Sequence, residues 1–451
     1  MIITVEMKSI LVLGAGRSCS TLISRLLERS IECGWKVVVG DIDLSVAQQK
    51  VSGHERGESF QLSTSDNQER DKRICEADLV MSMVPAFLHA SVAKVAISAG
   101  VPVVTPSYLN EEMMELDEAA KKAGVLVLNE IGLDPGIDHM SAMKVIDEIK
   151  ADGGVMKGFE SYCGGLVAEE SDNNPWHYKI SWNPRNIVLA GQGGSATFKD
   201  AGRVKLEPPH RVFRRLRAIE VEGQLYKGYP NRDSLAYEDI YNLPDMETLI
   251  RGTLRVDGFC RSWDILVQLG MVRDDAKLVW PKGISWSEWT RSFLPSKTAG
   301  MTVSDAINST VISDHETNER LEWLGLFDTE VGPEMTEGTP AEIIEALLVK
   351  KWALEDGDRD MIVMWHRFEF EKAGKRYAKT SEFFLEGRGS IYTAMSDTVG
   401  LPMAIAAEHM LVGGGFGTVG VQIPVTSNYY DVVLPKLEEF GVVFKESQIE
   451  L

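Results

Sequence analysis

The sequence has 451 residues, too many for one hydrophobic core, and its 44% hydrophobic and 25% charged residues are typical of a globular protein with two or three domains. Lys and Arg number 47 against 67 Asp and Glu, a formal net charge of −20, so we expect no nucleic-acid or anionic-membrane partner. Five cysteines without a C-x-x-C pair argue against a disulfide framework.

The start of the chain, MIITVEMKSILVLG, has no charged region leading into a long apolar stretch and no cleavage site. No apolar run approaches the roughly 20 residues that span a bilayer. With the cysteines read as reduced, these features predict a cytoplasmic protein with no membrane partner.

Apolar strands alternate with helical patterns through the first third of the chain. We expect strands at 8–13, 36–41, 77–85, 101–106 and 125–130, and helices after GAGRSC and at 46–53, 92–100 and 111–124. The stretch near FQLS is poorly defined. Alternating strands and helices of this length predict βαβ units in an α/β fold of the Rossmann type, with a doubly wound parallel sheet.

The pattern changes from about residue 151. The segments 156–166, 213–224 and 361–387 alternate as antiparallel strands do, and the last contains a hairpin turn at KAGK. Short amphipathic helical patterns fill the region between, which predicts an all-helical insert. A long helix over AMSDTVGLPMAIAAEHMLVGG and a final helix leading into a strand end the chain.

These patterns define three expected domains. Residues 1–137 and 392–451 form the dinucleotide-binding domain, residues 138–260 and 358–391 a mixed α/β domain for substrate binding and dimerisation, and residues 261–357 a helical domain.

The first strand ends in GAG, which is part of the dinucleotide fingerprint. Gly14 and Gly16 permit the tight turn and a close approach to the pyrophosphate at the helix N-terminus. Arg17 and Ser18 follow, and Cys19 stands where a third glycine is usual, so the motif is incomplete. Its place at the first strand–helix turn of a βαβ series favours a nucleotide site over a merely tight helix start.

Asp41 ends the second strand, where an acidic side chain accepts hydrogen bonds from the adenosine ribose of NAD. A carboxylate there repels the 2′-phosphate of NADP, and neither Ile42 nor Asp43 supplies a compensating cation. The residues themselves therefore favour NAD over NADP, against the alternative of a surface turn. Met83 and Val84, which end another strand, are expected to line the adenine and ribose cleft.

Several blocks occur in an order that resembles the saccharopine reductase family, the L-glutamate-forming saccharopine dehydrogenases. They are TPSYL (105–109), NEIGLDPGIDHM (129–140), ESYCGGL (160–166), YKISW (178–182), YPNRDS (229–234) and RGTLR (251–255). The resemblance implies an NAD- or NADP-dependent oxidoreductase that interconverts saccharopine with glutamate and 2-aminoadipate 6-semialdehyde, in a homodimer. Family members commonly use NADPH and carry an arginine just after the second strand, where this chain has Ile42.

Saccharopine carries three carboxylates and a secondary ammonium, so its site needs guanidinium groups, which grip carboxylates bidentately. In this acidic chain Arg232 and Arg255 are the expected substrate contacts, with Arg251 a weaker candidate and Thr253 adding a hydroxyl. Ser107 and Tyr108 follow a predicted strand, where side chains face the ligand crevice. Cys163 is also expected to contact the substrate, since Gly164 and Gly165 beside it let the backbone come close.

The loop GLDPG ends the strand at 125–130. The resemblance places its residues Leu133, Pro135 and Gly136 against the nicotinamide ribose. Asp134 is the expected carboxylate facing the reacting amine, where it would stabilise a cationic iminium or accept a proton. His139 is a second acid–base candidate, although a histidine at a helix start is as often structural.

Three alternatives also fit the sequence. Two are relatives that share the fold, lysine 6-dehydrogenase and carboxynorspermidine dehydrogenase, and the third is a non-catalytic nucleotide-binding protein. No H-x-x-x-H pair stands beside a carboxylate, so we expect no metal.

Overall fold

The computed structural model describes residues 7–63 and 65–451. It contains two compact units: unit 1 comprises Met1–Asp152 and Leu385–Phe444, and unit 2 comprises Gly153–Phe384 and Lys445–Leu451. Residues 1–6, which belong to the segment in which the sequence predicts no leader peptide, lie outside the described residues. Among the described residues, no helix is both long and apolar enough to cross a membrane.

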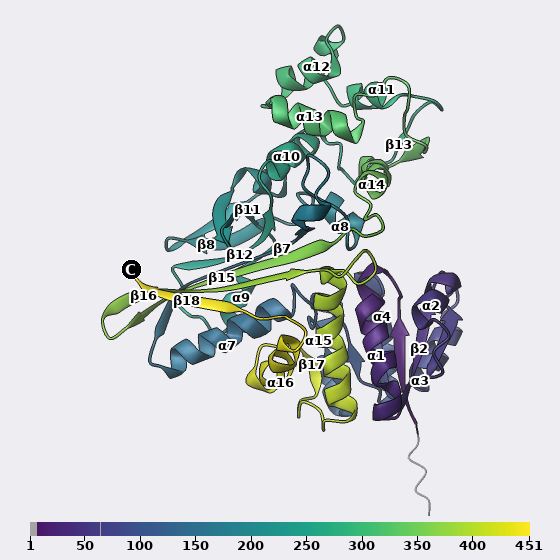
Figure 1. The fold of residues 1–451 in the computed structure, drawn as a ribbon, viewed down its shortest axis with the longest axis vertical. Coiled ribbons are helices and arrows are strands. Elements are labelled where there is room, and N and C mark those ends of the chain that lie inside the picture. Colours follow the sequence, from purple (N-terminus) through teal and green to yellow (C-terminus); the bar gives the residue numbers. More distant parts are fainter. Residues whose placement is uncertain (1–6, 64) are drawn as a thin grey trace, which may run out of the picture. The chain divides into compact units, whose positions relative to one another are not determined.

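Unit 1 is built on a parallel sheet with the strand order β17-β6-β5-β4-β1-β2-β3 (Figure 1). The order reverses between β1 and β4, which is the doubly wound arrangement, and this confirms the predicted Rossmann-type fold. The strands are β1 Lys8–Leu13, β2 Trp35–Asp41, β3 Gly57–Gln61, β4 Leu79–Ser82, β5 Val103–Val104, β6 Leu126–Leu128 and β17 Gly420–Gln422. The poorly defined stretch near FQLS contains the edge strand β3, and β17 was not predicted.

Helices follow the strands of this sheet, as the periodicity predicts. They are α1 Ser20–Cys33 (after the short η1 Arg17–Cys19), α2 Leu44–Val51, α3 Gln68–Cys75, α4 His89–Ala99 (after η2 Ala86–Leu88), α5 Glu111–Met114, α6 Asp117–Ala123, α7 Ile137–Ala151, α15 Ala394–Leu411 and α16 Ser427–Glu438. The single helix expected at 111–124 is wrong in one respect, because the chain forms two helices with buried Leu116 at their junction.

The late helix α15 packs against α1, far earlier in the sequence, and the two lie side by side in Figure 1. Their backbones approach closely at Gly400, where an added Cβ would lie 2.6 Å from the Leu22 nitrogen. Thr21 donates to the carboxylate of Asp397, and its backbone nitrogen donates to the Ser396 hydroxyl at 3.0 Å. Glycine is therefore required by packing at this helix crossing.

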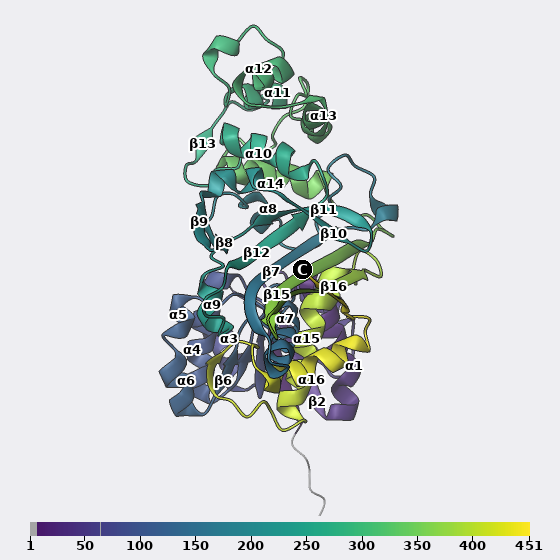
Figure 2. The same ribbon diagram turned by 90° about the vertical axis from the view of Figure 1, so that its left-hand side faces the viewer.

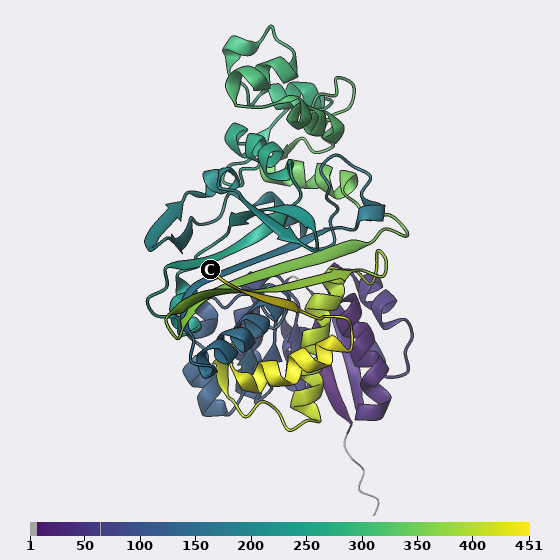
Figure 3. The same cartoon turned by 60° about the vertical axis from the view of Figure 1, so that its left-hand side comes forward.

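Unit 2 contains a mixed sheet with the order β10-β11-β12-β7-β15-β16-β18, and β8 and β9 extend it from β12. Its long strands run side by side in Figures 2 and 3. The strands are β7 Val155–Val167, β8 Ala196–Asp200, β9 Arg203–Glu207, β10 Arg217–Val221, β11 Gln224–Pro230, β12 Thr248–Arg255, β15 Asp360–Lys372, β16 Lys375–Glu386 and β18 Lys445–Glu450. Most neighbours are antiparallel as predicted, but β12 and β7 pair in parallel.

The segment expected to be all-helical lies inside unit 2. Its helices are α10 Phe259–Leu269, α11 Trp286–Arg291, α12 Val303–Thr310, α13 His315–Leu324 and α14 Pro340–Lys351; the unit also holds α8 Pro184–Val188 and α9 Ala236–Ile240, and Figure 2 shows α8, α10 and α14 near one another. One expectation fails, since β13 Leu278–Val279 pairs with β14 Glu337–Gly338. Five large aromatic side chains pack in the core of this part: Trp176, Tyr178, Phe259, Trp263 and Trp352.

The two ends of the predicted domains differ from the observed units. Helix α7 belongs to unit 1, whereas the expected boundary lay at residue 137. The final strand was expected in the nucleotide domain, but β18 pairs antiparallel with β16 in unit 2, with Ala378 opposite Ile449. An edge strand binds whichever sheet offers an unpaired edge, and alternation alone does not identify that sheet.

We expect Gly400→Ala to lower the free energy of unfolding by about 1–3 kcal/mol, because the added methyl group overlaps the backbone of α1. In an open helix the same change would stabilise by about 1 kcal/mol, so the sign is informative. Thermal or urea unfolding measures it. Gly300→Ala is the matched control, since a Cβ at Gly300 meets nothing within 4 Å; an unchanged or higher stability for Gly400→Ala would contradict the packing argument.

Candidate functional site

The turn after β1 has the geometry that a dinucleotide pyrophosphate requires. Gly14 has φ +99°, and a Cβ there would lie 2.7 Å from the Met83 carbonyl oxygen, so only glycine fits. A Cβ at Gly16 would meet nothing within 4 Å, which leaves the backbone of the turn open to a ligand. The turn leads through η1 into α1, whose N-terminus favours anions.

The third residue of the fingerprint, Cys19, faces inward. Its side chain is buried, and burial raises the pKa of the thiol to about 12, so the sulfur stays protonated and acts as a small apolar group. Arg17 is exposed and Ser18 is half-buried on the same short helix. Cys19 can therefore replace glycine here without closing the open side of the turn at Gly16.

Asp41 lies at the end of β2, beside this turn. One carboxylate oxygen accepts from the Ala15 nitrogen at 2.7 Å and the other from the Asp43 nitrogen at 3.0 Å. Ile42 next to it is 62% exposed and offers no charge. Among the described residues, no cation forms an ion pair with Asp41, so a negative charge stands unneutralised where the adenosine ribose of a dinucleotide is expected.

The remaining predicted residues of unit 1 follow β4, β5 and β6 at the same edge of the sheet. Met83 donates from its nitrogen to the Leu13 oxygen at 2.8 Å, and Val84 is half-buried beside it. Beyond β5, the Tyr108 hydroxyl donates to the Asp134 carboxylate at 2.7 Å. The structure thus brings together two side chains that were predicted separately, and both are half-buried.

The loop 132–136 that carries Asp134 closes on itself. The Gly132 nitrogen donates to the Pro135 oxygen at 2.9 Å, and the Gly136 nitrogen donates to the Asp138 carboxylate at 2.6 Å. At Gly136, φ is +145°, and a Cβ would lie 2.2 Å from the Gly132 oxygen. Leu133 and Pro135 are buried in the loop, while Asp134 stays half-buried. The glycines and the proline therefore fix the position of the Asp134 backbone.

His139 lies in the first turn of α7 and is fully buried. Its Nε2 is 2.6 Å from a carboxylate oxygen of Glu130, a buried residue that the sequence did not single out. Direct acid–base contact with a substrate is difficult for a side chain in this position. The visible signal for Glu130 was its place directly after a parallel strand, at the crevice edge.

A second histidine network was also missed. His89, the first residue of α4, is buried with its Nδ1 2.8 Å from the Ser82 hydroxyl and its Nε2 2.8 Å from the Ser107 hydroxyl. The Thr105 hydroxyl lies 3.3 Å from the same Nε2. Burial lowers the pKa of His89 from 6.5 to about 4, so the ring is neutral near pH 7 and holds one proton. The imidazole therefore orients the hydroxyl of Ser107, a predicted substrate contact.

Unit 2 gathers another set of predicted residues. Cys163 on β7 and Thr253 on β12 are register partners, and the Asn231 amide donates to the Thr253 hydroxyl at 2.7 Å. Arg255, two residues further along β12, is 4% exposed. Its guanidinium carbon lies 5.2 Å from the centre of the Tyr178 ring and 5.3 Å from that of Phe259.

Arg255 is a buried charge with few partners. Its Nη1 donates to the Leu254 oxygen at 2.8 Å, and its Nε has no hydrogen-bond partner. Within the described part of the chain it forms no ion pair with a carboxylate. Aromatic rings stabilise a guanidinium only in part, whereas a buried cation is usually paired, so this group is suited to receive an anionic ligand.

The other two arginines are placed differently. Arg232 follows β11, is exposed, and has φ +53°. Arg251 is buried on β12, with its guanidinium carbon 4.0 Å from the centre of the Tyr237 ring. Its stacked position fits a structural role, consistent with its lower rank as a substrate contact.

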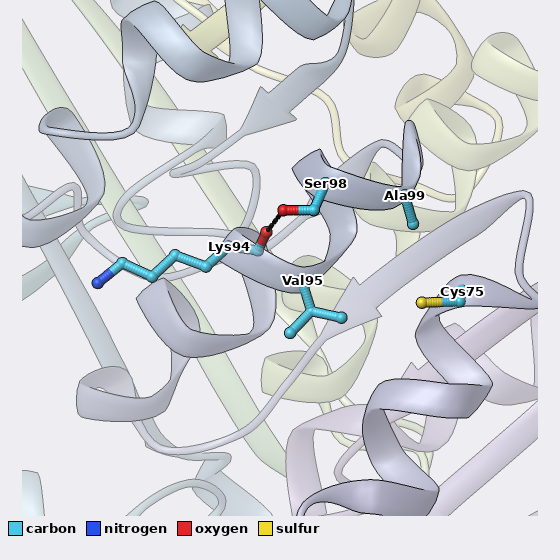
Figure 4. Close-up of a pocket in the computed structure, with 5 residues that line it drawn as sticks. All are labelled: Cys75, Lys94, Val95, Ser98 and Ala99. Carbon is cyan, nitrogen blue, oxygen red and sulfur yellow. Dashed lines mark hydrogen bonds between the residues drawn. The ribbon is translucent and has the colours of Figure 1, made fainter.

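A hollow elsewhere on unit 1 does not belong to this set. It is lined by Cys75, Lys94, Val95, Ser98 and Ala99 on α3 and α4 (Figure 4). Cys75 and Ala99 end their helices, which places the hollow toward the amino ends of the strands, opposite the GAG turn.

In the part of the chain that the structure describes, no group of three His, Cys, Asp or Glu side chains is arranged to hold a metal ion.

Comparison with known proteins supports one relationship along the whole chain. The family described as Saccharopine dehydrogenase NADP binding domain matches residues 10–128, and the Saccharopine dehydrogenase C-terminal domain matches residues 132–442. A Pyricularia oryzae protein named saccharopine dehydrogenase (NADP(+), L-glutamate-forming) is 35% identical over 98% of this chain and 99% of its own length. The Saccharomyces cerevisiae protein of the same name is 34% identical, covering 98% and 99%.

Solved structures agree. The apo saccharopine dehydrogenase (L-Glu forming) from Saccharomyces cerevisiae has a TM-score of 0.87 at 34% identity and covers 98% of this chain and 100% of that one. A homospermidine synthase from Legionella pneumophila, solved with NAD, has a TM-score of 0.58 at 10% identity over 98% and 91% of the chains, which shows a shared fold.

The buried His89 predicts an acid-dependent loss of stability. Its pKa is lower in the folded protein than in the unfolded chain, so the unfolded chain binds more protons between pH 6.5 and about 4. The contribution is complete above pH 6.5, and about 3 kcal/mol is lost as pH falls to 4.

Thermal unfolding between pH 7.5 and 4.5 measures this effect. His89→Asn should lower stability at pH 7.5 but flatten its decline toward acid. His315→Asn, which replaces a histidine with an 87% exposed side chain, should leave the profile of the original protein unchanged. Parallel profiles for the original protein and His89→Asn would refute the assignment.

Proposed function

The chain belongs to the saccharopine dehydrogenase family, in its L-glutamate-forming branch, and we propose that it interconverts saccharopine with glutamate and 2-aminoadipate 6-semialdehyde. The resemblance found in the sequence is thereby confirmed, and the protein is an oxidoreductase of lysine metabolism that uses a nicotinamide cofactor. A homodimer, implied by the same resemblance, stays a prediction.

One observation carries the substrate assignment: the buried guanidinium of Arg255 with no carboxylate beside it. The chain carries a net charge of −20, so a buried arginine without an acidic partner is unexpected unless a ligand supplies the anion. Saccharopine has three carboxylates, and its binding would give Arg255 the missing charge-assisted hydrogen bonds. The proposal uses Arg255 as the main anchor of one substrate carboxylate.

Other predicted contacts take complementary parts in this proposal. Arg232 is exposed and is proposed to contact a second carboxylate, and the Thr253 hydroxyl adds a neutral hydrogen bond. Cys163 lines the substrate from the adjoining strand. Ser107, oriented by His89, holds a carboxylate through its hydroxyl.

The residues at the GAG turn suit a dinucleotide, with the open backbone at Gly16 toward the pyrophosphate and Asp41 toward the adenosine ribose. Leu133, Pro135 and Gly136 are proposed to contact the nicotinamide ribose. When bound, the cofactor supplies a hydride to the substrate carbon or accepts one from it.

In the direction of saccharopine formation, the amine of glutamate adds to the aldehyde, and loss of water gives an imine that is protonated to a cationic iminium. The carboxylate of Asp134 stabilises that cation, and the Tyr108 hydroxyl holds the carboxylate in place through its hydrogen bond. In the reverse direction Asp134 accepts the amine proton through water. His139 is not assigned a direct catalytic part in this scheme, because its ring is fully buried.

For the cofactor we propose a preference for NAD. The supporting feature is the carboxylate of Asp41, which would repel a 2′-phosphate, together with the uncharged Ile42 beside it. The relatives are named for NADP(+), so a preference for NAD would distinguish the chain from them.

Arg255→Met should raise KM for saccharopine about 100-fold, because loss of a buried charge-assisted contact costs about 3 kcal/mol. The dissociation constant of the cofactor should stay within about twofold. Steady-state kinetics at 340 nm and fluorescence titration of the reduced cofactor measure the two quantities. Arg320→Met is the matched control, since Arg320 is another buried arginine of unit 2 and donates to the Pro175 oxygen; an equal rise in KM there would remove the special role of Arg255.

The original protein should oxidise saccharopine faster with NAD than with NADP. Asp41→Asn keeps an oxygen for the Ala15 nitrogen but removes the charge, so it should shift the ratio of kcat/KM toward NADP about tenfold or more. Asp43→Asn, which removes a neighbouring carboxylate, serves as the control. Activity with NADP alone in the original protein would keep the family assignment and reject the cofactor preference.

A further inference from the structure

Glu130 is a buried carboxylate that the proposed reaction does not use. It stands between β6 and the loop 132–136 and is 5% exposed. One oxygen accepts from the Leu109 nitrogen at 2.8 Å, and the other lies 2.6 Å from Nε2 of His139. Its own nitrogen donates to the Ser107 oxygen at 3.1 Å. A single side chain therefore joins two segments that are far apart in the sequence.

The backbone of Glu130 has φ +56°, in the left-handed region. Glycine, asparagine or aspartate is more usual there. Glycine has no Cβ to clash, and the short side chains of asparagine and aspartate form local hydrogen bonds in this conformation. Such a residue persists where its surroundings demand it, often beside a functional site. Here the left-handed backbone accompanies a carboxylate with contacts on both sides, which points to the side chain as the reason that a glutamate stands at this position.

The segments that Glu130 joins are those that carry Tyr108 and Asp134. Leu109 directly follows Tyr108, and His139 lies in the first turn of α7, just after the loop of Asp134. Tyr108 and Asp134 meet at 2.7 Å. Moving either segment by a fraction of an ångström would lengthen that hydrogen bond and turn the carboxylate away from its working direction.

We propose that Glu130, together with His139, is a positioning residue that sets the geometry of the Tyr108–Asp134 pair. This inference rests on the proposed function, in which that pair faces the reacting amine. Glu130 acts through Leu109 on one side and through His139 on the other, without touching substrate. It gives His139 a defined part, as the link between Glu130 and the helix that follows the loop.

Kinetics of three variants test the idea with saccharopine and the preferred cofactor. Glu130→Ala removes both contacts and should lower kcat at least tenfold, with cofactor binding changed less than about twofold. Glu130→Gln retains an acceptor for the Leu109 nitrogen and a hydrogen-bonding group for His139, so it should recover most of kcat. A glutamine variant as slow as the alanine variant would overturn the proposal.

The double variant Glu130→Ala/Tyr108→Phe should lose little more than the slower single variant, because both changes disable the same pair. If the fold-losses in kcat of the two single variants multiplied in the double variant, Glu130 would act independently of Tyr108, and the inference would be overturned. Tyr430→Phe is the matched control, since it deletes another tyrosine–carboxylate hydrogen bond of unit 1, to Asp147 at 2.7 Å. It should leave kcat unchanged and add independently to Glu130→Ala in thermal unfolding.

Amide hydrogen exchange separates failure of this proposal from failure of the proposed function, because it needs no turnover. In Glu130→Ala, exchange should accelerate at Leu109 and also at Gly132, Gly136 and Asp138, whose nitrogens make the hydrogen bonds of the Asp134 loop. In Glu130→Gln both regions should stay protected. Acceleration at Leu109 alone would overturn the positioning role, even in a protein that proved inactive with saccharopine.

Discussion

Parallel pairing of the strands in unit 1 is the constraint on which the nucleotide and loop residues depend. Parallel strands end at one common edge, and the turns after β1, β2, β4, β5 and β6 all emerge there. Each turn carries part of the proposed chemistry, from Gly14 and Asp41 to Tyr108 and Asp134. The apolar strands are buried and uniform, whereas the residues just beyond them are glycines, prolines and polar groups with specific partners. The parallel sheet thus places the loops at one edge, and the loops carry the side chains of the proposed site.

In unit 2, charge and burial determine which arginine is proposed to bind the substrate. Most of its arginines have acidic neighbours; Arg217 contacts Glu160, and Arg214 donates to Asp264 at 2.9 Å. Arg255 differs from these two: it is buried between Tyr178 and Phe259, and among the described residues no carboxylate forms an ion pair with it. The aromatic rings lower the free energy of the buried guanidinium without neutralising it. The proposed anion-binding group is thereby kept in place in a chain whose overall charge would otherwise repel the proposed acidic substrate.

The regular parts of the fold could be predicted from sequence because periodicity and burial coincide there, as in β1, β2, α1 and α15. The failures have local causes. Strand β3 is an edge strand with little apolar content, β13 and β14 have two residues each, and β18 joins a sheet whose partner strand lies some sixty residues earlier. Some site residues could also be predicted from sequence: Tyr108 and Asp134 are polar residues that follow apolar strands. Glu130 and His89 act through tertiary contacts, and no local pattern reports which hydroxyl or amide their side chains will meet.

The carboxylate of Asp41 connects local structure with cofactor choice. It accepts a hydrogen bond from the Ala15 nitrogen inside the GAG turn. The side chain therefore stabilises the conformation of the turn and also gives the turn a negative charge. These two roles limit which residues can replace Asp41. A residue that binds a 2′-phosphate would also have to accept the hydrogen bond from the Ala15 nitrogen. An asparagine meets that requirement in size and hydrogen bonding but gives no cation, and an arginine gives a cation but no acceptor. Under the proposed preference for NAD, conversion of this turn to a strong NADP site needs at least two substitutions, one to support Ala15 and one to bind the phosphate.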